Sequence, residues 1–315
     1  MIALFNGSKQ IFPDRRLACV LGWIGCIFLL LQSAFAQKGA GDVIYVPTPE
    51  VTINRLLEMA EVTARDFLID LGSGDGRIVI TAAKKYGARG LGVDLDPYLV
   101  QLSKDNAWRE GIRSQVDFIQ RNIFDTDVSR ATVVALYLSP ELNRRLRPKL
   151  LAQLRPGARV VSHDYGMDDW GPEQAEVIKV PGKTVGGVNG QSMAFLWIVP
   201  ANVIGTWEMK LGGTRSPVLY LLELDQAFQN IHGSLKIDKQ AREIRETKLH
   251  GDHIEFTVDA DSRGEHLTYE FSGRVEGRNM RGEVKVAHDA QVEKQPWEAK
   301  RLTQLQPLDT PPGKR

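Results

Sequence analysis

Between about residues 42 and 200, short apolar runs alternate with stretches whose apolar residues recur every three or four positions. The short runs predict strands. The recurring spacing, as in Leu142, Leu146 and Leu150, predicts amphipathic helices. Alternating strands and helices predict an α/β fold, namely a Rossmann-like, doubly wound and largely parallel sheet. The expected strands are residues 66–71, 90–94, 116–119, 131–138 and 158–162, with a late hairpin formed by 176–180 and 194–199.

Local start signals place three helices between these strands. One helix is expected over residues 77–86, directly after a glycine-rich turn. Asp96-Pro97 opens the second, because aspartate is a good N-cap and proline suits the first helical turn. Ser139-Pro140 marks the start of the third.

From about Ala201 the apolar positions change to a period of two, and glycine-containing turns separate the sets. This pattern predicts a small antiparallel β-barrel or sandwich over residues 201–303. Trp207 and Trp297 are expected in its core, with contact to a ligand as the alternative. Residues 304–315 contain three prolines and are predicted to be disordered. The alternating sets are Trp207/Met209/Leu211, Ile254/Phe256/Val258 and Leu267/Tyr269/Phe271.

The N-terminus has the parts of a secretory signal. Lys9, Arg15 and Arg16 precede a mostly apolar run, residues 17–31, and Ala34-Phe35-Ala36 then supplies a small-x-small cleavage site. A spanning helix needs roughly 20 apolar residues, so the run is short for a permanent anchor. The sequence therefore predicts a signal peptide over residues 1–36 and an exported, periplasmic or secreted protein. A membrane anchor at residues 17–31 is the alternative.

Charge and cysteine content narrow the classes of function. The chain has 40 basic and 39 acidic residues, and removing residues 1–36 changes the net charge from +1 to −1. A general nucleic-acid binder normally carries a basic excess, so no nucleic-acid partner is expected. Cys19 and Cys26 both lie in the predicted signal, so disulfides and thiolate metal sites are not expected. His250 and His253 would face opposite sides of an extended strand, and no metal is expected there either.

The segment 67–77 carries the clearest chemistry, because it joins the first predicted strand to the first helix. Ligands of doubly wound sheets bind at such carboxyl ends of strands. Its glycine spacing, Gly72-x-Gly74-x-Gly76, differs from the dinucleotide pattern G-x-G-x-x-G. Asp70 precedes the turn and would repel a pyrophosphate. It would attract S-adenosylmethionine, which carries an ammonium and a sulfonium and no phosphate, so the sequence predicts this cofactor over NAD.

Two further strand ends complete the predicted cofactor site. Asp94 lies 24 residues after Asp70, where a carboxylate can accept hydrogen bonds from ribose hydroxyls. Asn122 follows the third strand and can read the adenine edge, with Ile123 or Leu95 packed on the ring. Each residue also has a structural interpretation: Asp70 as a cap, and Asp94 and Asn122 as turn residues. The predicted cofactor-binding residues are Asp70, Leu71, Gly72, Ser73, Gly74, Gly76, Asp94, Leu95, Asn122 and Ile123.

Residues 70–77 with residues 92–97 resemble a class I, seven-β-strand methyltransferase. Further segments between about residues 42 and 172 are similar to the mitochondrial-type protein lysine methyltransferases and their bacterial relatives. Members of that family modify inner-membrane proteins such as an ATP synthase subunit and the adenine nucleotide translocase. Position 122 is often Asp in such relatives, and Asn122 keeps an acceptor but loses a charge. The segments that carry the similarity are residues 45–49, 70–80, 131–138, 146–150, 160–163 and Trp170.

The resemblance implies methyl transfer to a protein lysine, with an envelope or membrane protein as the expected target. The enzyme must align a neutral lysine and exclude water. Tyr137, at the end of the fourth strand, is the candidate catalytic residue, because its ring and hydroxyl can shape a lysine channel; the alternative is a buried aromatic. His163 and Asp164 can accept a proton or cap a turn. A small-molecule methyltransferase and a non-catalytic exported binding module remain open as alternatives.

Overall fold

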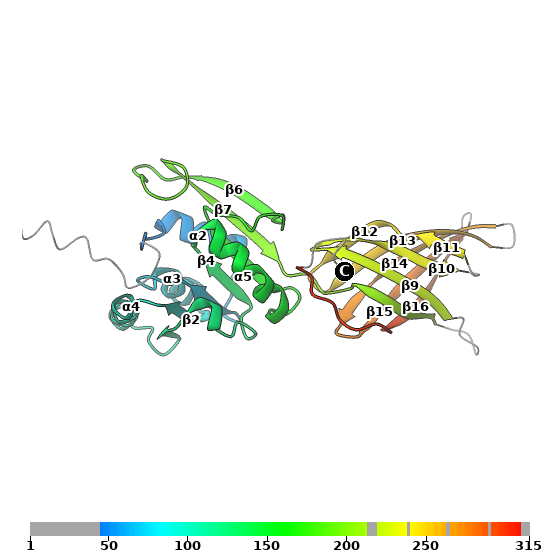
Figure 1. Ribbon diagram of the computed structural model, residues 1–315, viewed down its shortest axis with the longest axis horizontal. Helices are drawn as coiled ribbons and strands as arrows, with labels where there is room; N and C mark the ends of the chain where they lie inside the picture. The colour runs from blue at the N-terminus through cyan, green and yellow to red at the C-terminus, as the bar shows by residue number, and fades with distance from the viewer. Residues whose placement is uncertain (1–44, 213–218, 238–239, 263–264, 289–290, 310–315) are drawn as a thin grey trace, which may run out of the picture. The chain divides into compact units, whose positions relative to one another are not determined.

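The computed structural model describes residues 45–212, 219–237, 240–262, 265–288 and 291–309. Two separate sheets are present, one within residues 67–198 and one within residues 205–301 (Figure 1). The predicted signal at residues 1–36, with Cys19 and Cys26, lies outside the described residues, as does the alternative anchor at 17–31. Among the helices that are described, none has the length and apolarity needed to cross a membrane.

The first sheet has seven strands in the order β3-β2-β1-β4-β5-β7-β6, which confirms the predicted doubly wound α/β fold. Strands β1 to β5 are parallel, and β7 returns antiparallel between β5 and β6 as the predicted late hairpin. Parallel strands bring their carboxyl ends to one edge, so residues that follow β1, β2, β4 and β5 meet there. The strands are β1 Phe67–Leu71, β2 Arg89–Asp94, β3 Val116–Gln120, β4 Val133–Leu136, β5 Arg159–His163, β6 Gln174–Lys179 and β7 Gln191–Ile198.

The helices start where local signals place them. Helix α3, Arg77–Tyr86, has the predicted bounds. The Asp96 side chain accepts a hydrogen bond from the Tyr98 N–H and caps α4, Pro97–Arg109. Ser139 caps α5, Pro140–Gln153, in the same way through the Leu142 N–H. Because each cap acts within three residues, both helix starts were predictable from local sequence.

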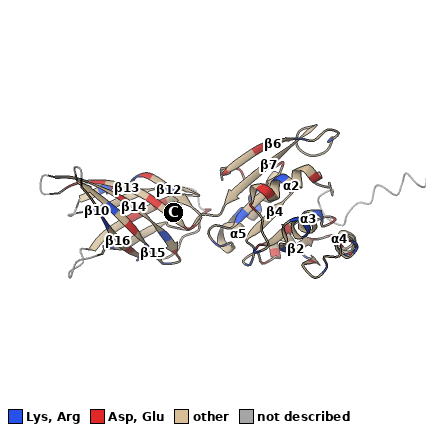
Figure 2. Ribbon diagram, turned by 180° about the vertical axis from the view of Figure 1, so that it is seen from behind, with Lys and Arg blue, Asp and Glu red and all other residues tan. Residues whose placement is uncertain are grey.

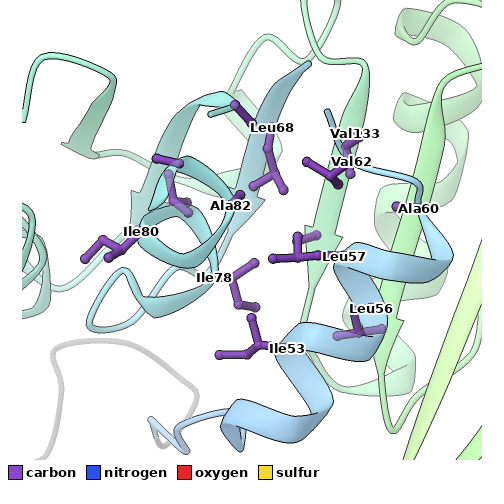
Figure 3. Close-up of a cluster of buried hydrophobic side chains, with 14 of the residues drawn as sticks. Ile53, Leu56, Leu57, Ala60, Val62, Leu68, Ile78, Ile80, Ala82 and Val133 are labelled. Atoms are coloured by element: carbon purple, nitrogen blue, oxygen red, sulfur yellow. The ribbon is translucent and has the colours of Figure 1, made fainter. Parts of the chain in front are cut away.

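One helix was not predicted. Helix α2, Glu50–Met59, precedes β1, and its apolar face is buried. Figure 3 shows Leu57 of this helix in the same apolar cluster as Leu68 of β1 and Val133 of β4. The signal was the recurrence of Ile53, Leu56 and Leu57 directly after a proline. The helix covers one face of the sheet and holds the preceding residues 45–49 near its edge.

The second sheet has nine antiparallel strands in the order β11-β10-β9-β8-β16-β15-β14-β13-β12, so the predicted all-β architecture is confirmed. The sheet is nearly closed into a barrel, because its two ends approach each other. There the Thr247 hydroxyl of β12 donates to the Ile231 carbonyl of β10. Buried side chains fill its interior, including Trp207, Phe256 and Trp297. The strands are β8 Gly205–Leu211, β9 Leu219–Ala227, β10 Asn230–Ile237, β11 Gln240–Glu243, β12 Arg245–His250, β13 His253–Ser262, β14 Glu265–Glu276, β15 Asn279–His288 and β16 Gln291–Arg301.

Two details of the β-region differ from the prediction. His250 and His253 flank a two-residue turn and pair directly across β12 and β13, rather than alternating along one strand. Within the described residues, no group of three or more His, Cys, Asp or Glu side chains is arranged as a metal site. The tail was predicted to be disordered from Gln304, yet Leu308 is buried and Asp309 forms an ion pair with Arg147, because both side chains find partners distant in sequence.

Basic and acidic positions are interspersed over both sheets (Figure 2). A surface of mixed charge does not attract one particular class of polyion.

Candidate functional site

The turn between β1 and α3 is built from glycines in the left-handed region. Gly72, Gly74 and Gly76 have φ values of 89°, 54° and 81°, which side chains with a Cβ rarely adopt. The N–H groups of Gly72 and Ser73 both donate to the Val93 carbonyl of β2, at 2.8 and 3.0 Å. The turn is therefore fixed against β2 and presents open backbone at the edge of the sheet.

Asp70 lies in β1 just before this turn and is 2% exposed. Within the part of the chain that the structure describes, its carboxylate has no hydrogen-bond or ion-pair partner. Burial, and secondarily the nearby Asp94 and Asp75, raise the pKa of Asp70 to about 8. A buried carboxyl group without a partner can pair with a cation, which is the ligand chemistry that the sequence predicts for Asp70.

Ser73 provides a second buried polar group, its side-chain hydroxyl, which has no hydrogen-bond partner among the described residues. A buried hydroxyl without a partner is unfavourable unless a ligand supplies one. Together with the open glycine turn and the Asp70 carboxylate, this hydroxyl fits a cofactor that carries both a cation and hydrogen-bonding groups.

Asp94 ends β2 and faces the same turn. Its Oδ2 accepts the Gly74 N–H at 2.9 Å, and its Oδ1 accepts the Asp96 N–H at 3.0 Å. Each carboxylate oxygen has two acceptor sites, so one on each remains for ribose hydroxyls. Asp94 thus has the turn role that was its structural alternative, and the remaining acceptor sites are compatible with the predicted contact to ribose.

The residues predicted to contact adenine differ in how far the structure leaves them available to a ligand. Asn122 uses its Oδ1 to accept the Phe124 N–H at 2.9 Å, which caps the short 3₁₀ helix η2, Ile123–Asp125. This is the turn role, and the amide N–H₂ is the part of Asn122 still available to a base. Leu95 is 47% exposed and Ile123 is half-buried, so both present apolar surface. The Leu71 side chain is fully buried, so only its main chain can meet a ligand.

Residues 45–49 cover this edge of the sheet. The Tyr45 ring lies against Gly74, where a Cβ would come within 2.3 Å of it. Arg77 donates to the Thr48 carbonyl at 3.1 Å, and the Thr48 hydroxyl lies 3.2 Å from Nδ1 of His163. Burial, and then the charge of Asp75, raise the pKa of Tyr45. The segment therefore packs against the glycine turn and reaches from Gly74 to His163.

Tyr137 follows β4 and connects the cofactor turn to the next strand end. Its neighbour Leu138 lies against Gly72, with Cδ2 3.0 Å from the position of a Cβ there. The Tyr137 ring lies 3.9 Å from the ring of His163 and 6.3 Å from that of Tyr165, measured between centroids. Burial, and then Asp164, raise the pKa of the Tyr137 hydroxyl, which keeps it protonated. An aromatic wall thus stands beside the cofactor site.

His163 is the last residue of β5 rather than a residue after the strand, and it has a structural role. Its Nδ1 contacts the Thr48 hydroxyl, and its Nε2 lies 2.8 Å from the Ser192 hydroxyl. Burial lowers the pKa of His163 to about 4, so the ring is neutral near pH 7. With both nitrogens engaged, His163 orients Tyr137 and residues 45–49, and it is not positioned as a general base.

The side chain of Asp164 is fully buried, and its backbone adopts an unusual conformation, with φ of 63°. Its Oδ1 accepts the Met193 N–H at 3.0 Å. Its Oδ2 lies 2.5 Å from Nζ of Lys183 and 3.4 Å from the Tyr137 hydroxyl. The patterns in the sequence did not single out Lys183. The available signal was four glycines, at 182, 186, 187 and 190, around one lysine.

Comparisons with known proteins find similar sequences over this part of the chain. Residues 70–174 match the model of the ANTKMT methyltransferase domain. The chain is 42% identical over 139 residues to a protein-lysine N-methyltransferase of Saccharolobus islandicus, covering 44% of this chain and 85% of that one. It is 34% identical over 129 residues to a lysine N-methyltransferase of Xenopus laevis that is named for a component of ATP synthase, covering 41% of this chain and 56% of that one.

Among solved structures, an RNA methyltransferase from Salinibacter ruber in complex with S-adenosyl-L-homocysteine is 44% identical. It covers 50% of this chain and 96% of its own length, with a TM-score of 0.46. Residues 70–174, which the family model matches, run from the end of β1 to the start of β6.

Proposed function

We propose, because this chain belongs to the S-adenosylmethionine-dependent protein-lysine N-methyltransferase family, that its substrate is a lysine of a membrane or envelope protein. The Xenopus laevis relative is named for a component of ATP synthase. The chain spans just over half of that relative, so the same kind of target is an expectation for this protein. Val185 and Val188, on the loop beside Lys183, are more than half exposed. They give apolar contact surface to the acceptor side of the site, which is the side with Tyr137 and Asp164 where the substrate lysine would bind.

The residues of the cofactor turn fit S-adenosylmethionine, which supplies a methyl group activated by its sulfonium. Asp70 would hold a cationic group of the cofactor, Ser73 would give or accept a hydrogen bond, and Asp94 would accept from the ribose. Residues 45–49 would exclude water from this edge. Excluding water strengthens each electrostatic contact in the site and protects the reaction from competing solvent.

The observation that carries the proposal is the aromatic wall formed by Tyr137 between His163 and Tyr165, adjacent to the cofactor turn. A lysine carries a four-carbon apolar stem and an ammonium. The ring face suits the stem, and the Tyr137 hydroxyl and Asp164 suit the nitrogen. Alignment of the nitrogen with the donor is the main contribution that the protein must make.

Replacing Tyr137 with alanine should lower kcat/KM for protein-lysine methylation by about 10- to 100-fold, because the wall that aligns the lysine is lost. Affinity for S-adenosylmethionine should stay within a few-fold. We would compare methyl-lysine in membrane proteins by mass spectrometry in strains with the wild-type gene, with a deletion and with Tyr137→Ala. Trp108→Ala removes an exposed aromatic ring on α4 and is the matched control.

An unchanged set of methyl-lysines in the deletion strain would refute the proposed substrate class. A methylated small molecule that disappears from the same strain would instead identify the alternative reaction. Normal lysine methylation by Tyr137→Ala would show that the aromatic wall does not align the substrate.

The proposal extends to the cellular compartment. We propose that residues 1–36 direct the protein out of the cytoplasm, so that the native chain begins at Gln37 in the envelope fraction. N-terminal sequencing of the native protein after fractionation measures this directly. A chain that retains Met1 in the membrane fraction would replace export with anchoring by residues 17–31.

A further inference from the structure

The loop between β6 and β7 places one lysine in the acceptor side of the site. Nζ of Lys183 donates to Oδ2 of Asp164 at 2.5 Å and to the Gln191 carbonyl at 2.7 Å. The side chain of Lys183 is 5% exposed and that of Asp164 is 0% exposed. This pair is therefore withdrawn from solvent, in contrast to most surface ion pairs, where both partners stay hydrated.

The glycines of the loop let it approach this closely. Gly186 has φ of 76°, and a Cβ on it would come within 2.1 Å of the Tyr137 hydroxyl. Gly187 has φ of 52°, and a Cβ on it would come within 2.7 Å of Cγ of Asp164. The Gly187 N–H also donates to the Tyr165 hydroxyl at 3.2 Å. The backbone of the loop thus lies directly on the residues of the aromatic wall.

Asp164 needs a cation, and few groups near it can supply one. His163 lies 3.4 Å from the same carboxylate oxygen, but its ring is neutral near pH 7. A buried carboxylate without a positive partner is costly, and a non-glycine residue at positive φ adds backbone strain. Strain of this kind persists where the surroundings require it, which is often at functional sites. Lys183 is therefore the group that balances the Asp164 charge in this structure.

The position and chemistry of this contact match those of the substrate. Asp164 follows β5 and Tyr137 follows β4, the strand that pairs with β1 of the cofactor turn. Lys183 carries the same primary ammonium on the same four-carbon stem as a substrate lysine. We infer that Asp164 and the Gln191 carbonyl form the binding site for the substrate ammonium, and that Lys183 is an internal occupant that a substrate lysine must displace.

This inference rests on the proposed function and deepens it. Nζ of Lys183 occupies the contacts that a substrate ammonium would make, so it competes for the site. A substrate lysine that displaces it binds as the ammonium and must lose one proton to solvent before its nitrogen can attack the methyl group. An occupant on the same chain has an effective concentration of about the millimolar range or above, and a free ligand must compete with it. The loop would thus favour substrates whose protein surface also displaces residues 180–190.

The test measures binding of n-butylammonium chloride, which reproduces the lysine stem and ammonium, to the purified full chain by calorimetry. Lys183→Met keeps the length of the side chain and removes the charge, so it should bind the probe at least 10-fold more tightly than the wild type does. Lys179→Met, an exposed lysine on the same hairpin, should match the wild type. Adding Asp164→Asn to Lys183→Met should abolish the gain. The KM for a protein lysine should fall in parallel with the tighter probe binding.

Equal probe binding by wild type, Lys179→Met and Lys183→Met would overturn the inference, as would a gain that survives Asp164→Asn. Lys183→Gln keeps a hydrogen-bond donor beside Asp164 and serves if the methionine variant does not fold by circular dichroism. These outcomes distinguish a failure of the ammonium site from a failure of the proposed function. Methyl-lysine that depends on the wild-type gene supports the function even where the probe test fails. A positive probe test with no such methyl-lysine would leave the ammonium site without the proposed reaction.

Discussion

Replacing Asp70 with asparagine is expected to weaken S-adenosylmethionine binding by about 30- to 1,000-fold. Loss of one partner from a buried charge pair costs about 2–4 kcal/mol, which corresponds to that change in Kd. Asp70 is 2% exposed, and its carboxyl group has no hydrogen-bond or ion-pair partner among the described residues, so a bound cation would be its charge partner. Isothermal titration calorimetry of both proteins measures the difference.

The same substitution should stabilise the ligand-free protein. Because the folded-state pKa of Asp70 is raised to about 8 from 3.8, the folded protein loses stability as the pH rises from about 4 to about 8. An asparagine side chain does not ionise and has no such dependence, so Asp70→Asn should melt several degrees higher at pH 8. Asp117→Asn, an exposed carboxylate on β3, is the control and should change neither quantity.

Cofactor affinity should follow the ionisation of Asp70. Since a cation binds the ionised carboxylate, affinity should rise about tenfold per pH unit below pH 8 and level off above it. Binding near pH 7 should therefore release a proton, which calorimetry in buffers of different ionisation enthalpy detects. Normal affinity of Asp70→Asn, or a flat pH profile in the wild type, would contradict the assignment of Asp70 to the cofactor.

Replacing Arg301 with alanine should destabilise the β-barrel by about 3–5 kcal/mol, through the cavity left behind and the loss of buried hydrogen bonds. Arg301 is 1% exposed and donates to the Ile204 and Asn202 carbonyls. Its guanidinium carbon lies 4.1 Å from the centre of the Trp207 ring. Burial, and then Arg278, lower the pKa of Arg301 to about 10, so it stays charged near pH 7.

Urea denaturation followed by circular dichroism measures this loss. Arg301→Met fills most of the volume but leaves the two carbonyls without their donor, so it should cost about 1–3 kcal/mol. Lys300→Ala, its exposed neighbour on β16, is the control and should stay within about 0.5 kcal/mol of the wild type. A wild-type midpoint for Arg301→Ala would show that the guanidinium does not hold the start of β8 to β16.

Features that depend on neighbouring residues were predictable from sequence. The bounds of α3 and the caps Asp96 and Ser139 act within a few residues, so their outcome is decided locally. The glycine turn with Asp70 was also readable, because positive φ and an acidic residue at a strand end leave few alternatives. The role of Asn122 was less predictable, because an amide side chain can cap a helix as well as it can bind a ligand.

Contacts between distant residues were not predictable. Thr48 meets His163 across 115 positions, and Lys183 reaches Asp164 from another strand pair. Arg301 lies buried in the barrel against Trp207, a residue of another strand. No local pattern marks such pairs, because the partner is chosen by how the strands order and pack.

The amino-acid sequence by itself determined the α/β architecture, the antiparallel all-β region and the acidic, glycine-rich turn after β1, since periodicity and turn chemistry act over short distances. Only the tertiary structure decided which polar groups share the acceptor side of the site. Parallel pairing of β1, β4 and β5 aligns Asp70, Tyr137 and Asp164 on one edge, and the β6–β7 hairpin carries Lys183 onto it. That choice is made by long-range packing and charge balance, which sequence spacing does not encode.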